Sequence, residues 1–155
     1  MKESYHEPKE LLHFAQDKLY AAYFLANEDP KFYDAAGYLA QLGIELLLKC
    51  LICLKNDRIP YTHKFDKLHS EEYLDESYPL DENSGKINRI DKFYGLRYPN
   101  FENPIEIGDE DFEMVKEIHG TLLEKIGEMM TEEDMRYEKF KKGGRVLLKR
   151  EKNSK

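Results

Sequence analysis

The stretch AAGYLAQLGIELLLKCLICL, residues 35–54, is apolar or glycine except for the Tyr38 hydroxyl and three polar side chains, Gln41, Glu45 and Lys49. Those three residues are spaced by four, so on an α-helix they drift by only about 40° per step and form one stripe. A helix that is apolar on nearly every side is a central element, because neighbours must cover it. The stripe is then either a solvent-exposed edge with a Glu–Lys surface pair or a polar line inside the protein.

The length and composition of the chain indicate one folded domain. Its 155 residues are 41% hydrophobic, which is enough apolar material for a core without disulfides. The net charge of −7 is unevenly spread, because residues 131–155 contain nine Lys/Arg and five Asp/Glu, whereas residues 1–130 contain fifteen and twenty-six. We therefore predict a helical domain over residues 1–130 and a basic, loosely held tail over residues 131–155. The tail either contacts phosphates or an acidic partner, or is only a solubilising end.

The negative charge of residues 1–130 and the presence of only two cysteines exclude several kinds of protein and indicate the cellular compartment. Non-specific duplex binding needs a positive face, so the acidic body argues against it but leaves room for a local basic pocket. Cys50 and Cys53 lie three apart and the chain has no second pair of cysteines, which argues against a zinc site or a disulfide framework and favours a cytoplasmic protein. The segment MKESYHEPKE lacks the apolar core of a signal peptide. Glu45 and Lys49 would each cost about 2.5–3.5 kcal/mol in a membrane, so no membrane span is predicted.

The apolar spacing along the chain predicts five helices and no strand. Pro30 separates the first two because it disfavours helix at Asp29, and Thr62 is placed to cap a helix that starts at His63. The five helices are expected at residues 8–26, 31–55, 63–74, 87–96 and 109–129. They indicate an all-α, up-down bundle. Because four short neighbours would leave part of the second helix uncovered, a homodimer is also expected.

The segment RIPYTH, residues 58–63, places Arg58 five residues before His63. In metal-independent RNA cleavage an imidazole transfers protons while an Arg stabilises the charge on the phosphorane. The alternative is that Arg58 is a solvated loop residue and that His63 bonds the backbone at a helix start. The sequence has no Gly-rich phosphate loop, no HExxH, no EF-hand loop and no nucleophile elbow, so neither a metal nor a cofactor is predicted.

Arg97, Tyr98 and Pro99 form a second candidate, at the expected end of the fourth helix. Arg binds phosphate in a bidentate manner, and a tyrosine ring can stack on a base. The alternative is that Arg97 bonds the last carbonyls of the helix and that Tyr98 packs in the core. His119 and the remaining histidines are assigned no role.

Three segments in this order resemble the HEPN domain family, over roughly residues 11–129. They are FYDAAGYLAQLGIELLLKCLI (32–52), YTHKFDKL (61–68) and INRIDKFYGLRYPN (87–100). The resemblance implies an up-down helical bundle, usually dimeric, that binds a nucleotide or RNA. It places the Gln–Glu–Lys stripe on the polar line of the family, His63 on its helix-start histidine, and Arg97 to Pro99 on its Arg-Tyr-Pro. Many members are paired with a small nucleotidyltransferase in toxin–antitoxin systems, so such a partner is implied.

The chain departs from the ribonuclease members of the family, which carry a His a few residues after an Arg near a late helix. The segment YPNFENPIEI that follows Arg97 contains no His. The first hypothesis is therefore a binding module, and catalysis is left open. In it a base stacks on Tyr98, Gln41 and Glu45 support the site, and phosphate is contacted by Lys49, Arg58, His63 and Arg97. The alternatives are a metal-independent endoribonuclease toxin that uses His63 with Arg58 or Arg97, and a non-catalytic interaction or antitoxin partner.

Overall fold

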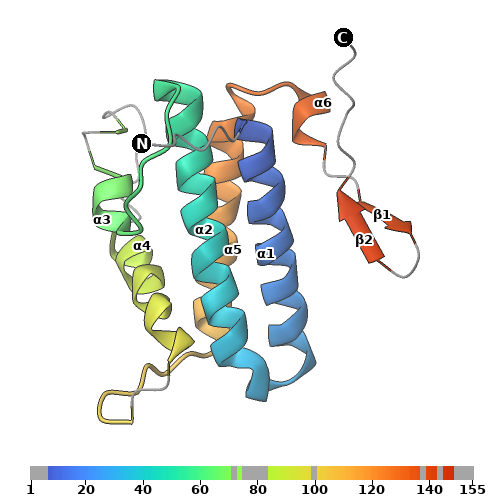
Figure 1. The fold of residues 1–155 in the computed structure, drawn as a ribbon. Helices are drawn as coiled ribbons and strands as arrows, with labels where there is room; N and C mark the ends of the chain where they lie inside the picture. The colour runs from blue at the N-terminus through green and yellow to red at the C-terminus, as the bar shows by residue number, and fades with distance from the viewer. Residues whose placement is uncertain are drawn as a thin grey trace.

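A pair of long antiparallel helices forms the centre of the molecule. In the computed structural model, α1 (Pro8–Glu28) and α2 (Tyr33–Asn56) are joined by the 3-10 turn η1 (Pro30–Phe32) and lie side by side (Figure 1). The Asp29 side chain accepts a hydrogen bond from the backbone N–H two residues later at 2.9 Å, so the local sequence fixes the turn. The structure describes residues 7–70, 73–74, 84–98 and 101–136, and the backbone of residues 139–142 and 145–148.

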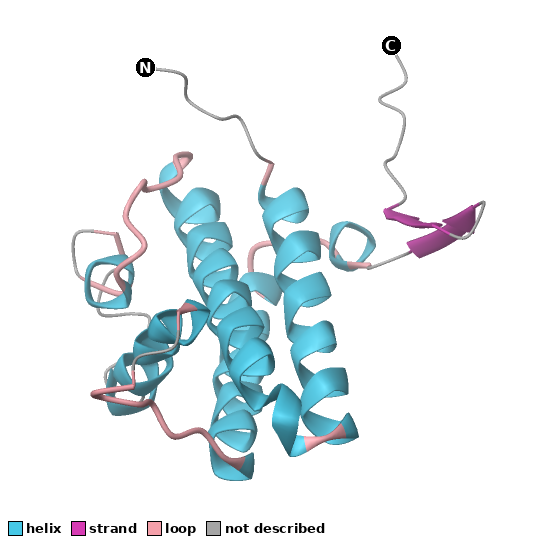
Figure 2. Ribbon diagram, turned by 60° about the horizontal axis from the view of Figure 1, so that its bottom comes forward, coloured by secondary structure: helices cyan, strands magenta, loops and turns pink. Residues whose placement is uncertain are grey.

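Helix α2 is largely covered by its own chain. Helix α1 packs on one side of it, α5 (Asp109–Gly127) lies behind, and the other side is followed by α3 (Phe65–Leu68), α4 (Ser84–Asp91) and the 3-10 helix η3 (Lys92–Arg97) (Figures 1 and 2). Among the described residues, the segment from η1 to the end of α2 is the one helical stretch long and apolar enough to cross a membrane. Its apolar window is 72% buried in the bundle, which is the burial expected of a core helix.

A short apolar strip of α2 stays partly uncovered by the rest of the chain. Ile44, Leu47, Leu48, Leu51 and Ile52 are buried by neighbours of the same chain, whereas Leu39, Leu42 and Leu46 are only partly buried. These three leucines lie on one face of α2, so the neighbouring elements reduce but do not remove the apolar surface on which the expectation of a homodimer rests. The oligomeric state stays a prediction.

Two glycines allow neighbouring elements to approach α2 closely. A Cβ at Gly43 would lie 2.5 Å from Leu19 Cγ, so α1 approaches the backbone of α2 at this point. A Cβ at Gly37 would lie 2.5 Å from Ile107 Cδ1 and 2.6 Å from Leu96 Cδ1. Glycine in a helix costs about 1 kcal/mol relative to alanine, and here this cost is offset by close packing of the neighbours.

The all-α fold class is confirmed, and the expected ends of the first, second and fifth helices differ from the structure by at most three residues. The third helix was placed wrongly, because it is only four residues long and begins at Phe65, not at His63. Thr62 does not cap it; its hydroxyl accepts a hydrogen bond from the Lys64 backbone N–H at 3.2 Å, ahead of the helix. The fourth predicted helix is two elements, since α4 begins before residue 87 and the chain tightens into η3.

The C-terminal part of the chain contains structure that the sequence did not predict. A short helix, α6 (Glu132–Met135), begins at Thr131, whose side chain accepts a hydrogen bond from the Asp134 backbone N–H at 3.2 Å. Strands β1 (Lys139–Lys142) and β2 (Arg145–Leu148) then form an antiparallel pair. Gly143 and Gly144 stand between the two segments in the sequence, and a Gly-Gly pair is a sequence signal for a two-residue hairpin loop. The rest of the predicted basic tail lies outside the described residues.

Candidate functional site

The polar stripe of α2 is an internal line and not a solvent-exposed edge. Gln41, Glu45 and Lys49 are 1%, 3% and 9% exposed, because α3, α4 and η3 cover this face of the helix. Lys49 Nζ lies 3.2 Å from Glu45 Oε1, and the same carboxylate oxygen contacts His63 Nδ1. The stripe therefore contains a buried charge pair, which stays favourable only while each charge keeps its partner.

His63 connects this buried pair to solvent. It lies in the segment between α2 and α3, just before α3 begins, and its side chain is 65% exposed. Glu45 is thus the shared partner of one buried cation and one exposed imidazole. The structure brings Glu45, Lys49 and His63 together into one cluster, the Glu45 cluster.

Asp91, which the sequence reasoning missed, holds α3 next to this cluster. Its carboxylate, at the end of α4, accepts a hydrogen bond from the Phe65 backbone N–H at the start of α3. Burial raises the pKa of Asp91, the carboxylates of Asp66 and Glu45 raise it further, and the Phe65 N–H acts in the opposite direction. An acidic residue at the C-terminal end of a helix opposes the helix dipole, and that was the one sequence signal for a tertiary role.

Arg97 forms a second group with three tyrosines. Its guanidinium carbon lies 3.7 Å from the ring centroid of Tyr94, 5.5 Å from that of Tyr98 and 6.0 Å from that of Tyr38 on α2. These contacts are cation–π interactions that hold the charged group over aromatic faces. Tyr98 is 74% exposed, so the alternative in which its ring packs in the core is wrong. Pro99, the third residue of the motif, lies outside the described residues.

A hollow of about 420 Å³ adjoins the Arg97 group. Its lining includes Asp34 from α2, Gly95 and Leu96 from η3, and the rings of Tyr98 and Phe101. The Phe101 ring is 92% exposed. The hollow is thus lined by two residues with exposed aromatic rings and by one acidic residue. The Arg97 guanidinium does not line it but contacts one of those rings, that of Tyr98.

The Arg97 group and the Glu45 cluster lie at different heights along α2. Tyr38, which contacts Arg97, precedes Glu45 by seven residues, or about 10 Å along the helix axis. Gln41 lies between the two groups. Arg58 belongs to neither, because its guanidinium lies 5.7 Å from the Tyr73 ring, beyond the end of α2.

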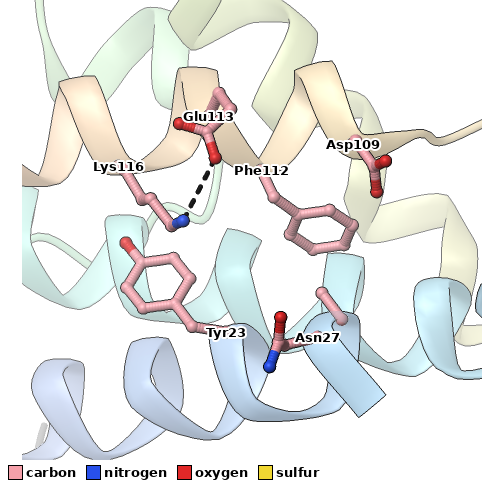
Figure 3. Close-up of a pocket in the computed structure, with 7 residues that line it drawn as sticks. Tyr23, Asn27, Asp109, Phe112, Glu113 and Lys116 are labelled. Carbon is pink, nitrogen blue, oxygen red and sulfur yellow. Dashed lines mark hydrogen bonds and ion pairs between the residues drawn. The ribbon is translucent and has the colours of Figure 1, made fainter. Parts of the chain in front are cut away.

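A separate hollow of about 290 Å³ lies between α1 and α5 and contains none of the predicted site residues (Figure 3). Tyr23 and Phe112 provide aromatic walls, and Lys116 Nζ donates to Glu113 Oε1 at 3.1 Å on its rim. Behind it, Tyr23 Oη and His119 Nδ1 lie 2.8 Å apart. Burial lowers the pKa of His119 and raises that of Tyr23, so both groups are held neutral.

Within the described part of the chain, no group of three or more His, Cys, Asp or Glu residues is arranged to hold a metal ion. Both cysteines are buried free thiols, as expected, and burial raises the pKa of Cys50 to about 12. The candidate site consists of the Arg97 group with the hollow next to it, the Glu45 cluster, and Gln41 between them.

Comparison with known proteins gives one family match. The family model of the HEPN domain matches residues 8–130, which include α1 to α5 and every predicted site residue. No curated protein and no solved structure was found to match the chain. The match confirms the family that the sequence resembled, and the chain therefore belongs to the HEPN domain family, a group of nucleotide- and RNA-related modules.

Proposed function

We propose that this chain is a nucleotide- or RNA-binding HEPN module in which Arg97 binds a phosphate and Tyr98 stacks on a base. The observation that carries the proposal is an exposed guanidinium, fixed over tyrosine rings, beside a hollow with two exposed aromatic rings. A planar guanidinium held in one orientation suits bidentate phosphate binding. Stacking on an aromatic side chain contributes about 1–3 kcal/mol per base.

The charges around the hollow suggest how a ligand lies in it. Asp34 repels phosphate from the wall that it forms, so the phosphate lies toward Arg97 and the base or ribose occupies the hollow. A second phosphate would meet His63, which is exposed, while Lys49 is buried and acts through Glu45. The proposed site does not include Arg58, because that side chain lies against Tyr73 beyond the end of α2.

Substitution of Arg97 tests the proposal directly. Arg97→Ala should weaken binding of a short single-stranded RNA about tenfold or more, measured by titration calorimetry, with the helical circular dichroism unchanged. Arg58→Ala is the matched control, since it also removes an exposed arginine that lies over a tyrosine ring. The affinity of Arg58→Ala for the same RNA should stay within about twofold of that of the unmodified protein. Absence of RNA binding by the unmodified chain, or equal losses in both variants, would refute the proposal.

Metal-independent RNA cleavage is a second candidate function, favoured by the contact between Glu45 and His63. An ionised carboxylate only accepts hydrogen bonds, so it fixes the Nδ1–H of His63 and leaves Nε2 to exchange a proton with RNA. RNA incubated with the protein and a chelator should then yield 2′,3′-cyclic phosphate ends, and His63→Ala should abolish them. RNA that stays intact would exclude this candidate without affecting the binding proposal. Pairing with a nucleotidyltransferase in a toxin–antitoxin system rests on the family resemblance, and co-purification of the two proteins would test it.

A further inference from the structure

Gln41 is a buried amide whose hydrogen-bonding capacity is unused within the described part of the chain. Its side chain is 1% exposed, and neither its amide nitrogen nor its amide oxygen has a partner among the described residues. An amide offers two N–H donors and an oxygen acceptor, and burying these groups without partners opposes folding. An apolar side chain of similar length would serve the core better. The amide therefore has no role in stabilising this fold that its contacts reveal.

The position of Gln41 connects it to the hollow beside Arg97. Gly37, one helical turn earlier on nearly the same face of α2, lies under Leu96, and Tyr38 lies under Arg97. Leu96 is also part of the wall of the hollow. The Leu96 side chain thus faces both the hollow and the α2 backbone one turn before Gln41, while Gln41 itself does not line the hollow. Leu96 belongs to η3, a 3-10 segment.

We propose that Gln41 recognises the base of the bound nucleotide, an inference that rests on the proposed function. Once the Leu96 side chain turns aside, a base in the hollow can meet the amide, which donates one N–H to a base acceptor and accepts one hydrogen bond from a base amino group. The amide is neutral and Glu45 follows one turn later, so this end of the site selects a base edge and disfavours phosphate. Adenine, with N7 beside its 6-amino group, is the base that a glutamine amide pairs with in this way.

The test compares oligoadenylate with an abasic ribose-phosphate strand of the same length, using the full-length protein. The unmodified chain should bind oligoadenylate at least about tenfold more tightly than the abasic strand, because base pairing with the amide and stacking are both lost with the base. Gln41→Met keeps the length and volume of the side chain and removes the amide. It should weaken oligoadenylate binding about tenfold, leave abasic binding within about twofold, and leave the melting temperature equal or higher.

The outcomes separate this inference from the proposed function. If neither strand binds, the proposed function fails. If both strands bind equally, or if Gln41→Met binds both strands as the unmodified chain does, the phosphate site stands and the role of Gln41 is refuted. If Gln41→Met does not fold, an NMR titration of the unmodified protein still tests the inference. The side-chain amide resonance of Gln41 in an NMR titration should shift with oligoadenylate and not with the abasic strand, and no shift with either would refute the inference.

Discussion

Two carboxylates, those of Glu45 and Asp91, and their partners hold the elements of the candidate site together. Glu45 is enclosed by α2 and its neighbours. The buried ammonium of Lys49 compensates its charge, and the exposed His63 ring contacts the same carboxylate oxygen. Asp91, a second carboxylate near it, is tolerated because the Phe65 backbone N–H donates to it. At this scale stability depends on pairing, because a buried charge that loses its partner is far more costly than an exposed one.

Removal of the Glu45 charge should destabilise the fold strongly. Glu45→Gln leaves the Lys49 ammonium buried without a counter-charge, and we expect a loss of about 3–5 kcal/mol in the free energy of unfolding, measured by urea denaturation. Glu113→Gln is the matched control, because it breaks an ion pair with Lys116 in which both side chains are more than half exposed. That change should cost less than about 1 kcal/mol. Similar losses in both variants would show that the Glu45 cluster is not an internal charge pair.

Asp91 should make the fold less stable as the pH rises through the acidic range. Burial raises its pKa in the folded state above the unfolded value, so the folded protein binds more protons in that window. The free energy of unfolding contributed by Asp91 therefore falls as pH rises from the unfolded pKa through the folded one. Asp91→Asn keeps an oxygen acceptor for the Phe65 N–H and removes the titration. Urea midpoints from about pH 3 to 7 should show a higher value for the variant at the upper end, and unchanged pH dependence would contradict the assignment.

At the scale of elements, close contacts between helices position the site. The α1–α2 pair depends on Gly43, which lets Leu19 reach the backbone of α2, and η3 depends in the same way on Gly37. These contacts explain why α2 has glycines within a long helix. They also place Leu96 and Arg97 directly over the N-terminal half of α2, where the hollow is found.

Alanine at Gly43 should separate the two long helices. Its Cβ would lie 2.5 Å from Leu19 Cγ and 3.2 Å from the Ala15 backbone oxygen, and the backbone cannot move aside cheaply. We expect Gly43→Ala to lower the free energy of unfolding by about 1–3 kcal/mol, measured by thermal or urea denaturation. Gly120→Ala on α5 is the control, because nothing lies within 4 Å of its added Cβ. It should stabilise the protein by about 0.5–1 kcal/mol through helix propensity, and a loss there would contradict this packing argument.

At the scale of the whole molecule, charge limits the kind of nucleic-acid binding that the proposal allows. The helical domain is acidic, and the proposed site offers phosphate two exposed groups, the Arg97 guanidinium and the His63 imidazole. Binding should therefore depend on shape and stacking at one site more than on a broad positive surface. The basic C-terminal residues are the one part of the sequence with a strong positive excess.

The salt dependence of RNA binding should consequently be shallow. Each neutralised phosphate on a single strand contributes a slope of about −0.7 in a plot of log affinity against log salt, so two contacts predict a slope of about −1.4. Fluorescence anisotropy at several salt concentrations measures it. A slope steeper than about −4 would show that the basic tail dominates binding, and removal of residues 139–155 would then make the slope shallow.

The sequence by itself determined the all-α fold, the positions of the three longest helices and the family. The family followed from the resemblance of three sequence segments to it. The fold class and the helix positions follow from local periodicity, because the spacing of apolar residues fixes which face of each helix is buried. The same spacing placed Gln41, Glu45 and Lys49 on one line. It did not show whether this line of side chains is exposed to solvent or buried, because that depends on which other elements cover it.

Only the tertiary structure decided how the candidate residues are grouped. It joined His63 to Glu45 and Lys49, set Arg97 among three tyrosines about two turns away along α2, and left Arg58 outside both groups. It also showed Asp91 binding the start of α3 and Gln41 buried without a partner among the described residues. The physical reason is that periodicity acts within one helix, whereas these contacts form between segments that irregular loops bring together. No repeating pattern in the sequence encodes the path of such loops.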